Sequence, residues 1–556
     1  MMILLPKKKI NIIKKMKRNY LLALLSAVLL WLAWPPMPFT SPILLFALVP
    51  LLIALDNIEK SDIFKKGRSI FLTSGFTFLV WNTASIYWVF NSLNAVMPTF
   101  AAIMLSLIPF GLGAFLMTLS FLCYKKVARI TKSLIADILL ISFWLSYEYL
   151  HQTWDLKFPW MNLGNGFAAT PQLIQWYEYT GVFGGTLWVL VSNILIFRVW
   201  KSFKVESEKL KVKRLGFTLV AWIVIPIAFS VYTYATYKEE INPANVVVVQ
   251  PNIDPYAKNF SLTPQVQVEK LIALSKQKAQ VNTEFIIWPE TAITGSNNEN
   301  DFRNTANFQS IQSLLDSFKN ATIISGIDSY LIYDTQKTPS AKFSKENKLW
   351  WDSFNAAVAI ENTPKLQFYH KSKLVPGVEK MPFPSVLSIL NPLFENFGGT
   401  TGGYGYQTEP SNLYASSGIG VVPAICYESI WGNWVAKSVQ KEAQFIAVVT
   451  NDGWWGNTSG KDQHLDYARL RAIENRRWVS RSANTGISAF INQRGDIVQR
   501  TKWWEEAVIK QDINLNSDFT FYTQHPDWLI FPFLFLGGFG MLLLIFSGFR
   551  RKKQLN

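Results

Sequence analysis

The order of apolar and polar positions divides the chain into three parts. Apolar runs lie near 20–34, 43–55, 70–90, 99–124, 134–150, 182–200, 215–237 and 528–548. A helix needs about 20 apolar residues to cross a bilayer, so the first two runs are short and the second could be re-entrant. The pattern predicts a membrane domain over 1–237 with about seven spans, a polar domain over 238–527, and a last span with a tail over 528–556.

Within 238–527 the pattern is typical of an α/β fold, because short β-branched runs alternate with polar helical stretches. Strands are predicted at 245–250, 284–288, 321–327, 354–361, 366–370, 419–425, 444–450, 478–483, 487–492 and 507–513, and helices at 264–281, 301–319, 430–442 and 461–477. The Lys-rich stretch 334–352 is expected to form a surface excursion. The apolar arm and glycine-rich hinge at 381–406 are interpreted either as a lid or lipid-facing flap or as ordinary core packing.

The basic residues lie in alternate loops. The segments 1–19, 56–69, 125–133, 198–214 and 550–553 together hold 26 lysines and arginines, whereas the loops 35–42, 91–98 and 151–181 hold one, Lys157. With eight spans all the basic segments fall on one side, which the positive-inside rule assigns to the cytoplasm. The domain 238–527 is then expected in the periplasm of a bacterial inner-membrane protein.

The net charge of +16 does not indicate a nucleic-acid partner. Residues 238–527 hold 27 basic and 29 acidic residues, so the excess of positive charge lies entirely among the apolar segments. Membrane topology explains that distribution, and a nucleic-acid footprint on the polar domain is excluded.

The chain has two cysteines, Cys123 in an apolar run and Cys426 in the polar domain. No disulfide framework is therefore expected, and a lone thiol outside the cytoplasm indicates a chemical role. The first apolar run ends in Trp31–Leu–Ala–Trp–Pro–Pro36 without a small-residue cleavage site, so we expect an uncleaved first span rather than a signal peptide.

Three predicted strands end in reactive side chains, Glu290, Lys371 and Cys426. Reactive groups at strand ends of an α/β fold converge on one crevice. A carboxylate that accepts the thiol proton, an ammonium that stabilises an oxyanion and a thiolate nucleophile suffice for thioester chemistry. Taken singly, Glu290 could instead cap a helix and Lys371 could be a solvated lysine. The four histidines show no metal-ligand spacing, and no G-x-S-x-G elbow marks a serine triad.

Four ordered motifs resemble those of the nitrilase superfamily: WPE at 288–290, YHK-x-x-LVP at 369–376, ICYE at 425–428 and TND at 450–452. The apolar spans, with FPWMNLG at 158–164 and glycines at 181–185, resemble the membrane-embedded branch, the apolipoprotein N-acyltransferase family. The resemblance implies a four-layer αββα sandwich beside a multi-span helical domain. The family's Phe-Gly-Glu is replaced here by Gly377–Val378–Glu379.

The resemblance also implies roles for individual residues. Glu290 would be the proton acceptor, Lys371 the oxyanion stabiliser and Cys426 the acylated nucleophile. Glu379 would be a second carboxylate near the pocket, with Tyr427 and Glu428 as its supporting neighbours. Apart from the resemblance, Asn451 and Trp454 are interpreted either as part of the pocket wall or as ordinary packing.

The implied reaction transfers an acyl chain from a phospholipid, through a thioester, to the N-terminal amine of a diacylglyceryl-modified apolipoprotein, the last step of bacterial lipoprotein maturation. Neither a metal nor another cofactor is expected, because the donor is already an ester, and a monomer is expected. The alternatives are a membrane-tethered amidase that uses water as acceptor, and a transporter or scaffold with a decayed domain.

Overall fold

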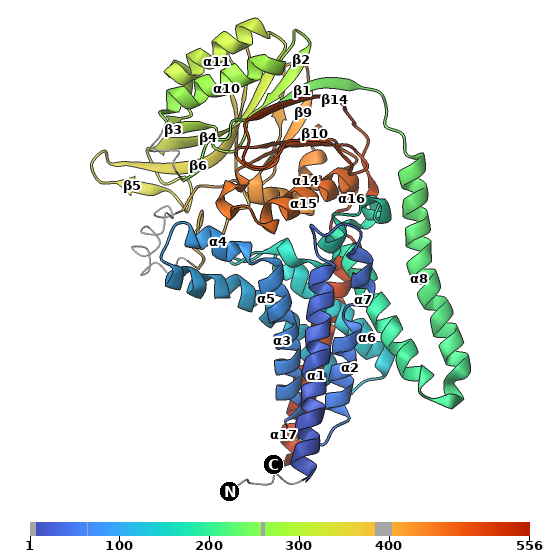
Figure 1. Ribbon diagram of the computed structural model, residues 1–556. Helices are drawn as coiled ribbons and strands as arrows, with labels where there is room; N and C mark the ends of the chain where they lie inside the picture. Colours follow the sequence, from blue (N-terminus) through green and yellow to red (C-terminus); the bar gives the residue numbers. More distant parts are fainter. Residues whose placement is uncertain (1–6, 64, 257–261, 384–402, 556) are drawn as a thin grey trace.

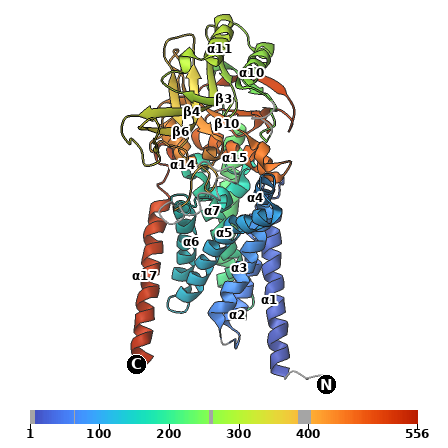
Figure 2. The same ribbon diagram turned by 90° about the vertical axis from the view of Figure 1, so that its left-hand side faces the viewer.

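The computed structural model, which describes residues 7–63, 65–256, 262–383 and 403–555, consists of a helical bundle and a β-sandwich. The sandwich sits on one end of the bundle, and both chain termini lie at the opposite end (Figures 1 and 2). The chain leaves the bundle through one long helix, forms the whole sandwich, and returns to the bundle with its last helix (Figure 1).

The bundle consists of nine helices among the described residues, most of them long and running between these two ends, whereas α4 is short and lies next to the sandwich (Figure 1). They are α1 (Lys7–Leu32), α2 (Val49–Glu59), α3 (Lys66–Ser85), α4 (Trp88–Asn94), α5 (Thr99–Val127), α6 (Ser133–Leu150), α7 (Tyr177–Phe203), α8 (Lys209–Thr236) and α17 (Ile530–Leu555). Among the described residues, six helical segments are long and apolar enough to cross a membrane. The pair α3–α4, bent by 58°, would be a seventh. The prediction of eight spans also counts α1, whose apolar part follows a lysine-rich first half, and it stays a prediction.

The predicted basic loops lie together at the end of the bundle that is far from the sandwich. Glu59, at the end of α2, accepts a hydrogen bond from Arg129 Nε in the α5–α6 loop at 2.8 Å. Asp56, one turn earlier, lies 3.2 Å from Lys201 Nζ near the end of α7. These ion pairs join three of the basic segments at one level of the bundle, as the positive-inside interpretation requires.

The sandwich is built from two mixed sheets. The first has the order β14 (Ala507–Asn514), β1 (Pro243–Gln250), β2 (Thr283–Ile287), β4 (Thr322–Tyr333), β6 (Leu349–Ile360) and β5 (Lys342–Ser344), with β3 (Ile293–Asn298) paired to β4 and β7 (Gln367–His370) paired to β6. The second has the order β13 (Ile497–Arg500), β12 (Ala489–Ile491), β11 (Val479–Ala483), β10 (Ala443–Thr450), β9 (Gly420–Ile425) and β8 (Leu413–Tyr414).

Both faces of the central strands are buried, which explains why their sequences are continuous apolar runs rather than alternating ones. Along β1, Val246 and Val248 pack between the two sheets, whereas Val247 and Val249 pack against α10 (Pro264–Lys278) and α11 (Ala306–Ser317). The second sheet is covered on its outer face by α14 (Gly432–Val439) and α15 (Ser459–Asn475), which also face the bundle (Figure 1). The predicted αββα sandwich and the helical membrane portion are confirmed.

All ten predicted strands are present, and the stretch 334–352 lies mostly at the surface, as predicted. It connects β4 to β6, each 12 residues long, and contains the short edge strand β5. Its polar residues suit an edge hairpin that projects into solvent and has little contact with the core. The predicted arm at 381–406 falls mostly outside the described residues, which resume at Gly403.

A buried glutamine joins the sandwich to the bundle. Gln463, on α15, donates hydrogen bonds to the carbonyl oxygens of Pro35 and Ser85, both at 2.9 Å. Its amide oxygen accepts from the indole nitrogens of Trp88, at 3.2 Å, and Trp160, at 2.7 Å. A buried amide is costly unless it is fully hydrogen-bonded, so this side chain fixes one position of α15 on the bundle.

The arrangement predicts the side on which each loop is exposed. Ser207 lies in the basic α7–α8 connection, and Thr153 lies in the α6–α7 loop beneath the sandwich; both are exposed. In cells, a cysteine placed at Thr153 should react with a membrane-impermeant thiol reagent, whereas a cysteine at Ser207 should react only after permeabilisation. External labelling at Ser207 would contradict the eight-span topology.

Candidate active site

The three predicted reactive residues follow strands that bring them to one place. Glu290 follows β2, Lys371 directly follows β7, and Cys426 directly follows β9. Strand β2 is parallel to β4. Strand β6 is antiparallel to both β4 and β7, so β7 runs in the same direction as β2. Glu290 and Lys371 therefore leave the first sheet at the same edge, where Cys426 approaches from the second sheet.

Lys371 is the centre of the site. Its Nζ lies 3.1 Å from Glu290 Oε1 and 2.7 Å from Glu379 Oε1, and its side chain is only 1% exposed. Burial alone would lower the pKa of Lys371, but the two carboxylates outweigh it and hold the pKa well above the ordinary lysine value. One ammonium between two carboxylates leaves one negative charge in excess, so a carboxylate remains able to accept a proton.

Asn355, on β6, completes this cluster and was not identified from the sequence. Its Nδ2 donates to Glu290 Oε1 and to Glu379 Oε1, each at 2.9 Å, and its carbonyl accepts from the Lys371 backbone N–H at 2.9 Å. The second oxygen of Glu379 accepts from the Val375 N–H at 2.8 Å. An asparagine inside an apolar strand, two positions from Ala357, is the signal that could have marked it.

The loop that carries Glu290 lies directly on β4. A side chain at Gly326 would place its Cβ 2.5 Å from the Thr291 nitrogen and 2.6 Å from Glu290 Cα, closer than real contacts allow. The Gly326 N–H also donates to the Pro289 carbonyl at 3.1 Å. Glycine is therefore required at this position for the general-base candidate to stay in place.

Cys426 adopts the left-handed backbone conformation, with φ 49°, which is strained for a residue with a side chain. Its carbonyl oxygen accepts from the Ser429 hydroxyl at 2.8 Å and lies 3.1 Å from His464 Nε2. His464 Nδ1 lies 2.9 Å from Asp452 Oδ1, and Arg481 donates to Asp452 Oδ2 at 2.7 Å. This buried network fixes the backbone of the nucleophile through its contacts with the Cys426 carbonyl oxygen.

Of the side chains in this network, the sequence motifs include only Asp452, in TND. Burial would raise its pKa, but Arg481 and His464 lower it to about 2. Burial lowers the pKa of His464, which favours the neutral imidazole. No group of three His, Cys, Asp or Glu side chains that could hold a metal ion occurs in the part of the chain that the structure describes.

The thiol of Cys426 is held in its neutral form at rest. Burial raises its pKa above the usual range of a thiol, Glu290 raises the pKa further, and Lys371 lowers it only in part. The thiol therefore needs a base to take its proton as it attacks, and the excess negative charge of the Glu290–Lys371–Glu379 cluster supplies one.

Glu428 and Tyr427 connect the nucleophile to its surroundings. Glu428 Oε1 accepts from the N–H groups of Ser372 at 2.9 Å and Lys373 at 3.3 Å, and Oε2 accepts from the Ile425 N–H at 3.3 Å. Burial raises the pKa of Glu428. Its carboxylate therefore ties the lysine loop to the nucleophile turn, while the Tyr427 hydroxyl donates to the carbonyl of Lys157, in the α6–α7 loop, at 3.0 Å.

The two remaining predicted positions lie further out. Asn451 is buried and accepts a 3.4 Å hydrogen bond from Thr485. Trp454 is 41% exposed, and its ring contacts Tyr256 with centroids 5.3 Å apart. Its neighbour Trp455 instead packs on Trp88. Among the residues that the structure describes, neither Asn451 nor Trp454 forms a hydrogen bond or ring contact with the Glu290–Lys371–Glu379 cluster.

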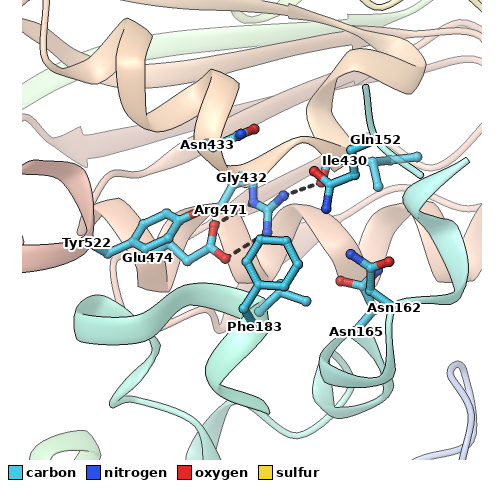
Figure 3. A pocket seen from close by; sticks show the side chains of 11 residues that line it. Gln152, Asn162, Asn165, Phe183, Ile430, Gly432, Asn433, Arg471, Glu474 and Tyr522 are labelled. Atoms are coloured by element: carbon cyan, nitrogen blue, oxygen red, sulfur yellow. Dashed lines mark hydrogen bonds and ion pairs between the residues drawn. The ribbon is translucent and has the colours of Figure 1, made fainter. Parts of the chain in front are cut away.

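A small cavity of about 20 Å³ lies between the sandwich and the bundle (Figure 3). Part of its lining, Ile430, Gly432 and Asn433, follows the nucleophile in the sequence. Arg471 and Glu474 of α15 form an ion pair in it, with Nε 2.8 Å from Oε2, and Arg471 also bonds the Ile430 carbonyl. Asn162 and Asn165 point toward this pair from the bundle side (Figure 3). The volume is enough for about one water molecule, so this polar cavity is no acyl-chain pocket.

Comparison with known proteins bears on both parts of the chain. The family model described as carbon-nitrogen hydrolase matches residues 245–517, and the model of the apolipoprotein N-acyltransferase N-terminal domain matches residues 26–195. The apolipoprotein N-acyltransferase of Chlorobaculum tepidum is 29% identical over 95% of this chain and 97% of its own length. The one of Geobacter metallireducens is 26% identical over 96% of each chain.

The raised pKa of Cys426 predicts how the thiol reacts with an alkylating reagent. Since the neutral form is favoured, alkylation by iodoacetamide should still increase above about pH 9.5, where a free thiol of pKa about 8.5 is already almost fully ionised. Peptide mapping by mass spectrometry, with Cys426→Ala to identify labelling at Cys123, would measure it. A rate that levels off near neutral pH would instead show a resting thiolate paired with Lys371.

Proposed function

Because the chain belongs to the apolipoprotein N-acyltransferase family, we propose that Cys426 carries an acyl chain, as a thioester, from a phospholipid to the N-terminal amine of diacylglyceryl-cysteine on an apolipoprotein. The observation that carries the mechanism is the buried ammonium of Lys371 between Glu290 and Glu379, beside the lone thiol of the sandwich. The relatives do not favour the amidase alternative.

In the first step, Glu290 takes the proton of the Cys426 thiol as the sulfur attacks the ester carbonyl. The Lys371 ammonium and the Tyr427 backbone N–H stabilise the oxyanion of the tetrahedral intermediate. The bond to the glycerol oxygen then breaks, and that oxygen receives the proton from Glu290. The products are a lysophospholipid and an S-acyl Cys426.

In the second step, the free amine of the lipid-modified cysteine attacks the thioester. Glu290 accepts a proton from the attacking nitrogen and returns it to the departing sulfur, which restores the neutral thiol. Glu379 keeps its negative charge throughout and holds Lys371 in position with Asn355. All these groups belong to one chain, so a monomer suffices for both steps.

The same proposal places the protein in the bacterial inner membrane with the sandwich in the periplasm. It is supported by the shared end of the basic loops and both termini, opposite the sandwich. Both substrates carry their acyl chains in the membrane, and α15 lies between the second sheet and the bundle, so the site is close to the plane of the lipids.

The covalent intermediate gives a direct test. Purified protein mixed with phospholipid and no acceptor should gain one fatty-acyl mass on Cys426, which neutral hydroxylamine removes. Adding a diacylglyceryl-cysteine peptide should convert the adduct to a stable amide, and Cys426→Ala should show no adduct. Rapid hydrolysis without acceptor would favour the amidase alternative, and the absence of any adduct would overturn the mechanism.

The two carboxylates should separate by role. Glu290→Gln should slow acylation of Cys426 by about 10²- to 10⁴-fold, because the thiol loses its base. Glu379→Gln should slow turnover less, since Glu290 still takes the proton while Lys371 is held by fewer partners. Glu284→Gln, on the strand β2 that precedes Glu290 but away from the cluster, is the matched control. Wild-type acylation in Glu290→Gln would move the base assignment to Glu379.

A further inference from the structure

Three lysines lie in segments that contact the turns of Cys426 or Glu379, and none of them takes part in the proposed proton transfers. Lys157 is in the α6–α7 loop of the bundle, Lys373 follows the catalytic lysine by two residues, and Lys380 directly follows Glu379. All three are half-buried. They come from three separate segments, so their proximity is produced by the fold and not by a basic stretch of sequence.

Hydrogen bonds of the main chain fix these segments on the catalytic residues. The Lys157 carbonyl accepts from the Tyr427 hydroxyl at 3.0 Å, next to the nucleophile. The Lys373 N–H donates to Glu428 Oε1 at 3.3 Å. The Lys380 carbonyl accepts from the Gly377 N–H at 2.8 Å, in the turn that holds Glu379. The positions of the three lysines are therefore set by the same contacts that build the site.

Among the described residues, the three ammonium groups have a single ion pair between them. Lys380 Nζ lies 3.4 Å from Asp155, and Lys373 Nζ lies over the Trp434 ring at 4.1 Å from its centre. Within the described residues, Asp155 is the one carboxylate in ion-pair contact with the three, and Lys157 Nζ has no hydrogen bond or ion pair. Burial, together with repulsion by Lys373 and Lys380, lowers the pKa of Lys157 to about 8, although Asp155 and Glu428 raise it in part. An anion bound among the three would relieve that repulsion.

The position of Lys157, in the loop between the bundle and the sandwich, indicates which anion can bind there. The α6 helix ends at Leu150, and in the loop that follows Lys157 stands between Trp154 and Phe158 in the sequence. Tryptophan and other aromatic rings concentrate at the level of lipid headgroups, where the phosphates lie. Lys157 is also the one basic residue in the outward loops 35–42, 91–98 and 151–181 of a chain that keeps its other bundle lysines at the opposite end.

We propose that Lys157, Lys373 and Lys380 bind the phosphate of the phospholipid that donates the acyl chain, and so place its ester next to Cys426. The proposal rests on the proposed function, since it specifies how the donor of that reaction is recognised. Ammonium groups hold phosphate through charge and through three N–H donors each. The acceptor, a diacylglyceryl peptide, has no phosphate, so the site acts in the acylation step alone.

Lys157→Gln tests this assignment in single-turnover acylation. With phosphatidylglycerol in mixed micelles, formation of the S-acyl adduct at low lipid should be about fivefold slower, corresponding to roughly 1 kcal/mol per lysine near a lipid surface. With p-nitrophenyl palmitate, an ester without phosphate, the rate should not change, nor should discharge of the preformed adduct by the peptide. Lys157→Arg should restore most of the rate, and Lys345→Gln, at the exposed β5–β6 turn, is the charge-matched control.

Equal slowing with both esters would overturn the proposal, because the lysine would then only shape the site, and so would an unchanged rate with phosphatidylglycerol. A binding assay separates this test from catalysis: in a Cys426→Ala background, Lys157→Gln should bind an ether-linked phosphatidylglycerol about fivefold more weakly and ether-linked diacylglycerol equally. Retention of that difference when the wild type forms no adduct would overturn the proposed function alone. Displacement of the ether lipid by equimolar inorganic phosphate would show a site for free phosphate and overturn the assignment to a headgroup.

Discussion

The buried ammonium of Lys371 is the interaction on which the arrangement of the site depends. A charge that is almost fully removed from water is tolerated only when it is paired and hydrogen-bonded, and Lys371 meets that condition with two carboxylates rather than one. Strands β2, β6 and β7 and the turn after Val375 must therefore all reach one point. The second carboxylate is also what gives the cluster its excess negative charge, since a single ion pair would leave no group ready to take the thiol proton.

The nucleophile is constrained from the opposite side, and this constraint extends into the membrane part. His464 supports the Cys426 carbonyl, and the adjacent Gln463 bonds two backbone carbonyls and two indoles of the bundle. One turn of α15 therefore determines both how the sandwich sits on the bundle and where the nucleophile turn lies. On this side of the site, α15 lies between the second sheet and the bundle (Figure 1).

The sequence identified the buried features of the fold better than the exposed ones. Val246 to Val249 of β1 form an apolar run because both faces of the strand are covered, and β1 is one of ten strands that were predicted. The strands β3, β5, β8 and β13, which have only two to six residues each, were missed. In the site, the ends of β2, β7 and β9 marked Glu290, Lys371 and Cys426. Asn355 was missed because an asparagine within an apolar strand indicates a buried polar contact but does not show that its partners are Glu290 and Glu379. His464 was judged only as a metal ligand, while its contacts are to Asp452 and to a backbone carbonyl that no sequence pattern reveals.

The distribution of charge around the site also suits a reaction with two different lipids. The catalytic cluster is negative in sum, and three half-buried lysines stand around it with Asp155 as their one ion-pair partner among the described residues. A donor with a phosphate gains from the lysines, and its lysophospholipid product keeps that phosphate, so very tight binding would slow its departure. Asp155 opposes this, because its contact with Lys380 competes with the phosphate for the same ammonium. The glycerolipid of the acceptor has no phosphate and gains nothing from the lysines, so these charges favour the donor in the first step and do not contribute to binding of the acceptor in the second.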